Sequence, residues 1–166
     1  MSDKTQSILI GGVATAVLAV ILSLPQNQCL SCLVCLSYVG SGLIAVWHYT
    51  NTNTLTIKGG EGAGLGAMAG VVCGVVAGVL GLIFRAIGLL PGVDDIIEQM
   101  DEAGQLDQLD PETADMIYSF IEISAGIGGI VIGVIFAVIL GVIGGAIGAA
   151  VFKKGTATPG EVSDLV

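Results

Sequence analysis

Four cysteines are the residues of this sequence whose type and spacing could support chemistry. Cys29, Cys32 and Cys35 follow one another at intervals of three in the stretch CLSCLVC, and Cys73 lies farther along the chain. Four thiolates could hold zinc or an iron–sulfur cluster, although ferredoxin cluster sites add a cysteine followed by proline, which is lacking here. Cysteine is also a small apolar packing residue, and a disulfide is a further alternative. We expect packing, and we assign no metal and no cofactor.

Arg85 and Glu122 are the next candidates, because each is an ionisable residue within a long apolar stretch. Charged side chains in such surroundings are costly, and they are usually paired or functional. Both residues lie near one end of their stretches, so we expect an intramembrane ion pair between Arg85 and Glu122. A role in ion passage is the alternative.

The remaining polar patterns do not form a catalytic set. His48 is the sole histidine, and the sequence predicts no serine, cysteine or carboxylate beside it. We expect it to lie, with Trp47 and Tyr49, at a membrane interface. The stretch GGEGAGLGAMAG follows no strand and contains no Walker lysine, and a basic patch for nucleic acid is lacking. The sequence therefore predicts a protein that is not an enzyme.

Long apolar runs must position these residues. Of the 166 residues, 54% are hydrophobic and 11% are charged, against about 45–50% apolar and about 25% charged in soluble domains. Four runs are long enough to cross a hydrocarbon core about 30 Å thick, at residues 8–24, 29–50, 62–90 and 111–152. The sequence therefore predicts an all-α integral membrane protein: a single membrane domain over residues 1–166, with four transmembrane helices in two antiparallel hairpins.

The fourth run has a marked start and an excess of length. Asp110 is a good N-cap, and Pro111 suits the first helical position. A helix over residues 111–152 would be about 60 Å long at 1.5 Å per residue, which is far more than the bilayer core requires. We expect it to tilt, to kink at its glycines or to project from the membrane.

Residues 91–115 form an acidic loop between the third and fourth runs. Its stretch DDIIEQMDEAG predicts a short amphipathic outer helix, capped by Asp94, ended by Gly104 and lying on the membrane surface. A charge run of this kind is a solvated face or docks a basic partner, and the loop lacks the EF-hand pattern. Its acidic residues are Asp94, Asp95, Glu98, Asp101, Glu102, Asp107, Asp110, Glu112 and Asp115.

Small residues recur at every fourth position in the last two runs. Lipid is as apolar as leucine, so membrane helices associate by close packing, which small residues permit. Stripes of this kind favour a right-handed crossing of about -40 to -50°. We expect the two stripes to pack against each other; a subunit contact formed by an outward stripe is the alternative. The stripes contain Gly62, Gly66, Gly70, Gly74 and Gly78 in one run, and Ala125, Gly129, Gly133, Ala137, Gly141, Gly145 and Ala149 in the other.

The lysines predict the orientation of the chain in the membrane. They lie before the first run, between the second and third runs, and at the start of the polar tail 153–166, namely Lys4, Lys58, Lys153 and Lys154. By the positive-inside rule, both termini are expected in the cytoplasm. No A-x-A-like cleavage site follows the first run, so we interpret this run as an uncleaved transmembrane helix.

Three features lie between the first run and Gly78: Pro25 with the cysteine cluster, the aromatic end of the second run, and the stretch KGGEGAGLGAMAG. This part of the chain resembles a group of uncharacterised small prokaryotic four-transmembrane-helix proteins with glycine-zipper helices. The resemblance implies a four-helix membrane fold in a prokaryotic cytoplasmic membrane, and it implies no particular activity.

These observations favour a structural or accessory membrane protein that associates through glycine-zipper packing, as a subunit of a larger membrane assembly or as a homo-oligomer. The expected partners are the lipid bilayer and other membrane subunits or further copies of the chain, but not nucleic acid. A small channel or transporter subunit is the alternative. A cysteine-based membrane metal or redox protein is the second alternative.

Overall fold

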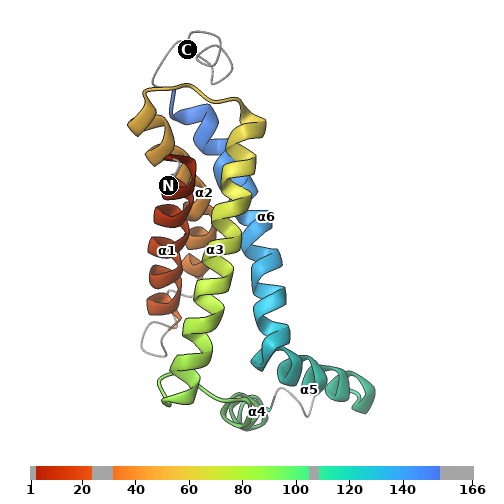
Figure 1. Ribbon diagram of the computed structural model, residues 1–166. Coiled ribbons are helices and arrows are strands. Elements are labelled where there is room, and N and C mark those ends of the chain that lie inside the picture. Colours follow the sequence, from red (N-terminus) through yellow and green to blue (C-terminus); the bar gives the residue numbers. More distant parts are fainter. Residues whose placement is uncertain (1–2, 24–31, 105–108, 154–166) are drawn as a thin grey trace.

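The computed structural model is all-helical, and it describes residues 3–23, 32–104 and 109–153, apart from the side chains of Cys32 and Ala125. Four of the helices within these ranges are long and apolar enough to cross a membrane: α1, α2, α3 and α6. Figure 1 shows them side by side, with two shorter helices across one end. The helices are α1 (Asp3–Leu22), α2 (Cys32–Asn53), α3 (Gly59–Ala86), α4 (Val93–Glu102), α5 (Pro111–Ala125) and α6 (Ile127–Val151).

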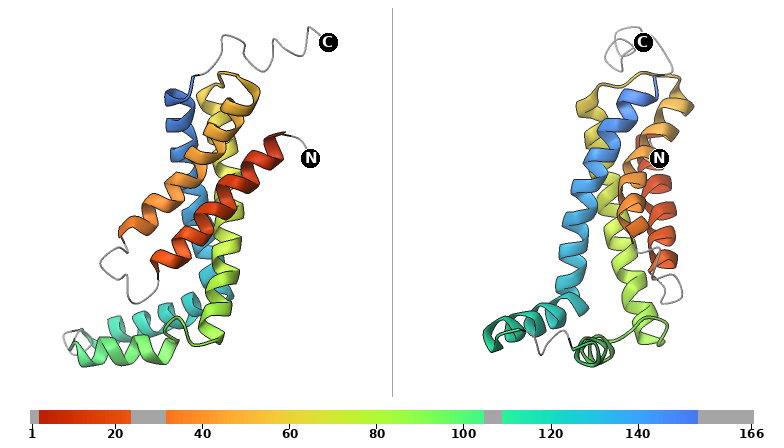
Figure 2. Two further views of the ribbon diagram at one scale, coloured as in Figure 1. Left: turned by 90° about the vertical axis from the view of Figure 1, so that its left-hand side faces the viewer. Right: turned by 180° about the vertical axis from the view of Figure 1, so that it is seen from behind.

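The α3 and α6 helices form the spine of the bundle, since they have the most extensive contact of any pair. The α2 helix packs against α1, α3 and α6, while α1 packs against α2 and α3. Figure 2 shows that α3 and α6 extend beyond α1 and α2 toward the end where α4 and α5 lie. At the opposite end, a small core of Val46, Tyr49, Ile57, Leu65 and Ala149 joins α2, α3 and α6.

The α3 helix ends four residues before the predicted end at residue 90. Gly88 has a φ of +74°, a left-handed conformation that costs glycine little. Its N–H donates to the carbonyl of Arg85, and the N–H of Leu89 donates to the carbonyl of Phe84 at 2.8 Å. These bonds form a Schellman motif, which satisfies the last carbonyls of the helix and ends it before Pro91.

The predicted fourth helix over residues 111–152 is divided in the structure at Gly126, which has φ -100° and ψ -152° and serves as the N-cap of α6. The prediction of one continuous helix over these residues was therefore wrong. A kink at a glycine was one of the three outcomes that its excess length led us to expect. Three glycines lie close together here, Gly126, Gly128 and Gly129, and each costs about 1 kcal/mol in a helix relative to alanine. The break turns α5 away from the axis of α6 (Figure 1).

The α4 helix begins earlier than predicted, because its N-cap is Gly92 and not Asp94. The carboxylate of Asp95 accepts a hydrogen bond of 2.8 Å from the Gly92 N–H. Asp95 thereby satisfies the backbone donor at the cap, which leaves Asp94 within the first turn. Gly104 follows the helix with a φ of +61°, at the predicted end of this element.

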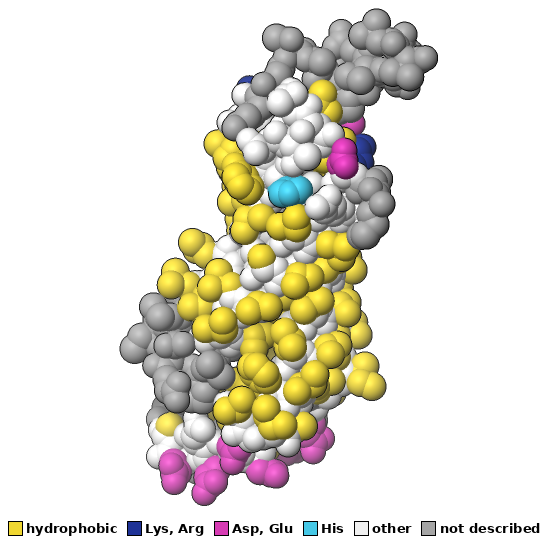
Figure 3. Space-filling view, turned by 60° about the vertical axis from the view of Figure 1, so that its left-hand side comes forward, with side chains coloured by type: hydrophobic (Ala, Val, Ile, Leu, Met, Phe, Trp, Pro, Cys, Tyr) yellow, Lys and Arg dark blue, Asp and Glu magenta, His cyan; other side chains and the backbone are white. Residues whose placement is uncertain are grey.

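Apolar side chains cover the middle of the molecule, while carboxylates gather at one end of it (Figure 3). Large apolar residues of the four long helices are exposed at levels unusual for a soluble bundle, for example Leu18 at 47%, Ile83 at 48% and Ile135 at 53%. Lipid is the surrounding that suits such a belt. The distribution therefore agrees with the four candidate membrane spans.

The predicted cap of α5 is confirmed. Asp110 is its N-cap and Pro111 stands at its start. The Asp110 carboxylate accepts hydrogen bonds from the Thr113 hydroxyl at 2.7 Å and from the Thr113 backbone N–H at 3.0 Å. These bonds, the hydroxyl bond first, hold the pKa of the Asp110 carboxyl below its ordinary value.

This cap predicts a pH-dependent first turn of α5. Because the pKa of Asp110 is lower in the folded helix, the cap stabilises the helix above the ordinary carboxyl pKa and loses this effect as the pH falls through the depressed value. We expect the NMR shift of the Thr113 amide proton to titrate with a midpoint below the ordinary pKa of an aspartate. An Asp110→Asn control keeps an acceptor and removes this titration; a wild-type midpoint at the ordinary value would contradict the assignment.

Candidate functional site

The most extensive contact between two helices contains a glycine seam between α3 and α6, formed by Gly62, Gly66 and Gly70 facing Gly145, Gly141 and Ala137. A Cβ atom added at Gly62 would lie 2.5 Å from the Gly145 carbonyl oxygen. At Gly66 and Gly141, a Cβ on either residue would meet the carbonyl oxygen of the other. The two backbones therefore touch directly, and side chains larger than hydrogen do not fit between them.

Toward the α4 end, the α3 stripe meets Val134 and Ile130 of α6 and not its glycines. A Cβ at Gly74 would lie 2.7 Å from the Cα of Val134, and one at Gly78 would lie 3.0 Å from side-chain atoms of Ile130. The partners on α6 thus change from every fourth residue to a three-residue step between Ala137 and Val134. Each four-residue step turns about 40° past one full turn of a helix, so a four-residue stripe drifts around the helix. The three-residue step from Ala137 to Val134 compensates for this drift and keeps α6 residues facing α3.

Gly129 and Gly133 consequently leave the α3–α6 contact that the sequence stripe predicts for them. A Cβ at Gly133 would meet no atom within 4 Å, and one at Gly129 would meet the carbonyl of Ser124 in the α5–α6 turn. The uninterrupted four-residue register thus takes these two glycines out of contact with α3. Both line a cavity instead.

A second set of glycines, missed by the sequence analysis, joins α2 to α6. Gly42 faces the backbone of Gly141 and Gly145, and Gly144 faces the carbonyl of Val39. A Cβ at Gly148 would lie 3.0 Å from the Val46 side chain. The sequence signal for this contact was the four-residue spacing of Gly144 and Gly148, which lies beside the predicted stripe that contains Gly141 and Gly145. One helix thus presents two adjacent small-residue faces to two neighbours.

The α1 helix is held in the same way. A Cβ at Gly11 would lie 2.7 Å from the carbonyl oxygen of Ser41 on α2, and one at Gly12 would lie 2.7 Å from the Val72 side chain on α3. The buried polar residue nearby, Thr15, donates to the carbonyl of Gly11 at 2.6 Å. Glycine contacts therefore connect all four long helices.

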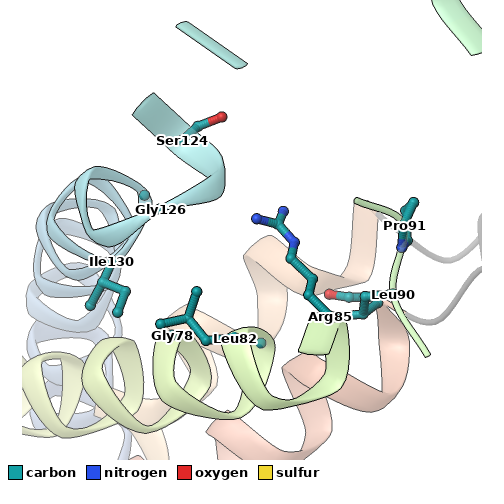
Figure 4. Close-up of a pocket in the computed structure, with 11 residues that line it drawn as sticks. Gly78, Leu82, Arg85, Leu90, Pro91, Ser124, Gly126 and Ile130 are labelled. Atoms are coloured by element: carbon teal, nitrogen blue, oxygen red, sulfur yellow. The ribbon is translucent and has the colours of Figure 1, made fainter. Parts of the chain in front are cut away.

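Arg85 lies in a cavity of about 310 Å³ at the open end of the spine, where α3 ends and α6 begins. Figure 4 shows its guanidinium pointing toward the Ser124–Gly126 turn. An adjoining cavity of about 150 Å³ continues between the helices past Tyr38, Gly74 and Gly133. The Ser124 hydroxyl donates to its own helix, to the Ile121 carbonyl. The described lining thus combines one cationic side chain with several glycines. This combination suits the binding of a ligand, and the described lining contains no nucleophile paired with a base.

The two charged candidates are placed at the same end of the molecule. Arg85 is partly buried and faces the cavity, while Glu122 lies on the exposed surface of α5. The guanidinium points toward Ser124 and Gly126, which follow Glu122 in the chain by two and four residues (Figure 4). The Arg85–Glu122 ion pair stays a prediction.

The cysteines are divided between different surroundings. Cys35 is exposed on α2, while Cys73 is buried on α3, where the Thr15 hydroxyl lies 3.4 Å from its Sγ. Cys29 lies outside the described residues, and Cys32 is in α2 with its side chain not described. Within the described ranges, no group of three His, Cys, Asp or Glu residues could hold a metal ion. The described geometry of Cys73 is that of a packing residue.

His48 has a partner that the sequence did not reveal. Its Nδ1 lies 2.8 Å from the hydroxyl oxygen of Ser7, which is fully buried on α1. The Ser7 hydroxyl donates to the Asp3 carbonyl, also at 2.8 Å. The Ser7 hydroxyl thus joins the start of α1 to the His48 ring of α2, and the pair is a clamp between α1 and α2.

Comparisons with known protein families, characterised proteins and solved structures find no match for this chain. The resemblance to small prokaryotic four-helix membrane proteins accordingly stays a prediction. The geometry described above is the basis of the proposals that follow.

The glycine seam predicts opposite outcomes for one substitution at two sites. Gly66→Ala places a Cβ on the Gly141 carbonyl, so the helices must separate, at a cost of about 1–3 kcal/mol. Gly133→Ala enters open space and gains up to about 1 kcal/mol of helix propensity. Thermal unfolding in detergent measures both. A Gly66→Ala protein as stable as Gly133→Ala would contradict the seam.

The Ser7–His48 clamp predicts a difference between two buried serines. Ser7→Ala removes a hydrogen bond between helices and should lower the unfolding free energy by about 1 kcal/mol. Ser37→Ala removes a bond to its own helix, to the Leu33 carbonyl, and serves as the control. Equal unfolding temperatures for the two variants would rule out the clamp.

Proposed function

We propose that this protein is a structural or accessory subunit of a membrane assembly and not an enzyme. The observation that carries the proposal is the glycine seam, because it fills the space between α3 and α6 with backbone over three turns. Close packing of this kind gives a rigid spine at the expense of interior space. A rigid spine with a wide apolar surface suits a part that other subunits pack against.

The buried polar side chains support a structural role over a transport role. Thr15, Ser41 and Thr50 each donate to a carbonyl of their own helix, at 2.6, 2.7 and 2.9 Å. Among the described residues, no buried side-chain nitrogen or oxygen lacks a hydrogen-bond partner. Polar groups satisfied in this way are not available to replace the hydration shell of a passing ion.

The proposed arrangement in the membrane is two antiparallel hairpins with both termini in the cytoplasm of a prokaryotic cell. Three lysines support it, since Lys4 in the first turn of α1, Lys58 before α3 and Lys153 after α6 lie at one end, while Arg85 lies at the other. The α4 helix would then lie on the outer surface as an amphipathic helix. Its acidic residues are exposed, while Ile96, Ile97 and Met100 are half-buried.

Two kinds of contact are available for partners. The glycine seam is occupied within one chain, so glycine-zipper association between chains would need glycines outside the seam that the bundle leaves open. The exposed carboxylates of α4, including Asp94, Glu98 and Asp101, would dock a basic extramembrane surface. We propose both contacts as routes of assembly.

A channel or transporter subunit is the second candidate function. The Arg85 cavity favours it, because a cation at the mouth of a space between helices could select an anion. Flux of chloride into proteoliposomes, lost on Arg85→Ala, would favour this candidate. Proteoliposomes that contain the purified protein and remain impermeable to chloride would favour the structural role.

Purification from native membranes in a gentle detergent, followed by mass analysis of the intact complex, tests the structural role. We expect other subunits or further copies in fixed stoichiometry. The variant Asp94→Asn/Glu98→Gln/Asp101→Asn should lose a partner that docks on α4, whereas the control Asp3→Asn/Glu61→Gln at the other end should retain it. A monomer without partners from native membranes would contradict the proposal.

A further inference from the structure

A cavity of about 310 Å³ lies at the end of the bundle remote from α4, between the first turns of α1 and α3. Lys4, Thr5 and Ile8 line it from α1, and Glu61, Gly64, Leu65 and Met68 line it from α3. The buried ring of Tyr49 on α2 completes it. Its volume is at the lower end of the range for small-molecule sites.

The interior of this cavity is apolar and open to the α3 backbone. A Cβ added at Gly64 would meet no atom within 4 Å, so the space lies directly over this glycine. Leu65 belongs to the small core at this end and Ile8 packs against it, while Met68 is 60% exposed. An alkyl chain passing along α3 would find room at Gly64 and apolar contacts on both sides.

The rim of the cavity carries one charge of each sign on different helices. The Lys4 ammonium lies over the Tyr49 ring, 5.6 Å from its centroid, in a cation–π contact. The Glu61 carboxylate belongs to the α3 wall. A ligand complementary to this rim therefore has an anion and a cation side by side, joined to an apolar portion.

The level of the cavity in the bundle matches the headgroup region of a bilayer. It lies at the beginning of two candidate spans and at the end of a third. Trp47, 45% exposed, precedes Tyr49 by two residues, and such aromatic residues favour the interface. Figure 3 shows basic and acidic side chains near each other at this end, directly beyond the apolar belt.

We propose that this cavity binds one phospholipid with a phosphate and a primary ammonium in its headgroup, such as phosphatidylethanolamine. Lys4 contacts the phosphate, Glu61 accepts hydrogen bonds from the ammonium, and the first methylenes of an acyl chain lie over Gly64. A glycerol headgroup has no cation for Glu61, and a choline headgroup has no N–H to donate to it. The inference requires a bilayer around the helices, but it does not depend on the subunit role.

Native mass spectrometry tests the site, with the full chain in micelles that contain equal amounts of phosphatidylethanolamine, phosphatidylglycerol and phosphatidylcholine. We expect one retained lipid, with phosphatidylethanolamine preferred. Lys4→Ala and Glu61→Gln should each reduce its retention by about tenfold, the effect of losing one charge-assisted hydrogen bond. Equal retention of the three lipids, or a preference for phosphatidylglycerol, would overturn the proposal.

Gly64→Leu fills the cavity and should abolish retention of the lipid, while Gly133→Leu, which enters open space elsewhere in the bundle, should leave it unchanged. The unfolding temperature of each variant reports whether the fold persists. Should Gly64→Leu fail to fold, the exposed Glu61→Gln decides the matter alone. Full retention of phosphatidylethanolamine by Glu61→Gln would overturn the assignment.

Discussion

Two helix backbones in this protein lie so close that the carbonyl oxygen of one occupies the place of a side chain on the other. Gly66 and Gly141 face each other in this way, and Gly62 and Gly145 repeat the contact one turn away. Lipid offers no hydrophobic drive for helix association, so the density of van der Waals contact must hold α3 and α6 together. The positions of α1 and α2 follow, since both pack on the flanks of this spine through glycines of their own.

The same contact explains where the bundle opens. A strict four-residue stripe rotates around a helix, so both stripes cannot face each other along their full length. The two stripes meet near the end of the bundle where Lys4, Lys58 and Lys153 lie, and they separate toward α4. There Gly133 faces open space and Arg85 lies in a cavity. The break at Gly126 stands at this open end and turns α5 across it. Packing and cavity thus share one geometric origin, and the bend lies at the same end of the bundle.

Composition and periodicity predicted the four long apolar helices, the Asp110 cap and the stripes themselves, because each depends on residues close together in sequence. The break at Gly126 was not located, since any of several glycines could have kinked the helix. The Ser7–His48 contact and the contacts of Gly42 with α6 depend on which helices become neighbours. Local patterns do not contain that information. The rotation that removes Gly133 from the seam was calculable, but only relative to a partner of known register.

Solid-state NMR of the protein in bilayers, labelled with ¹³C at glycine, measures the central contact directly. The account predicts cross-peaks between the Cα and carbonyl carbons of Gly66 and Gly141 and of Gly62 and Gly145. These cross-peaks should persist when labelled chains are diluted with unlabelled ones, because both helices belong to one chain. Absence of the cross-peaks, or their loss on dilution, would contradict a backbone contact between α3 and α6 of one molecule.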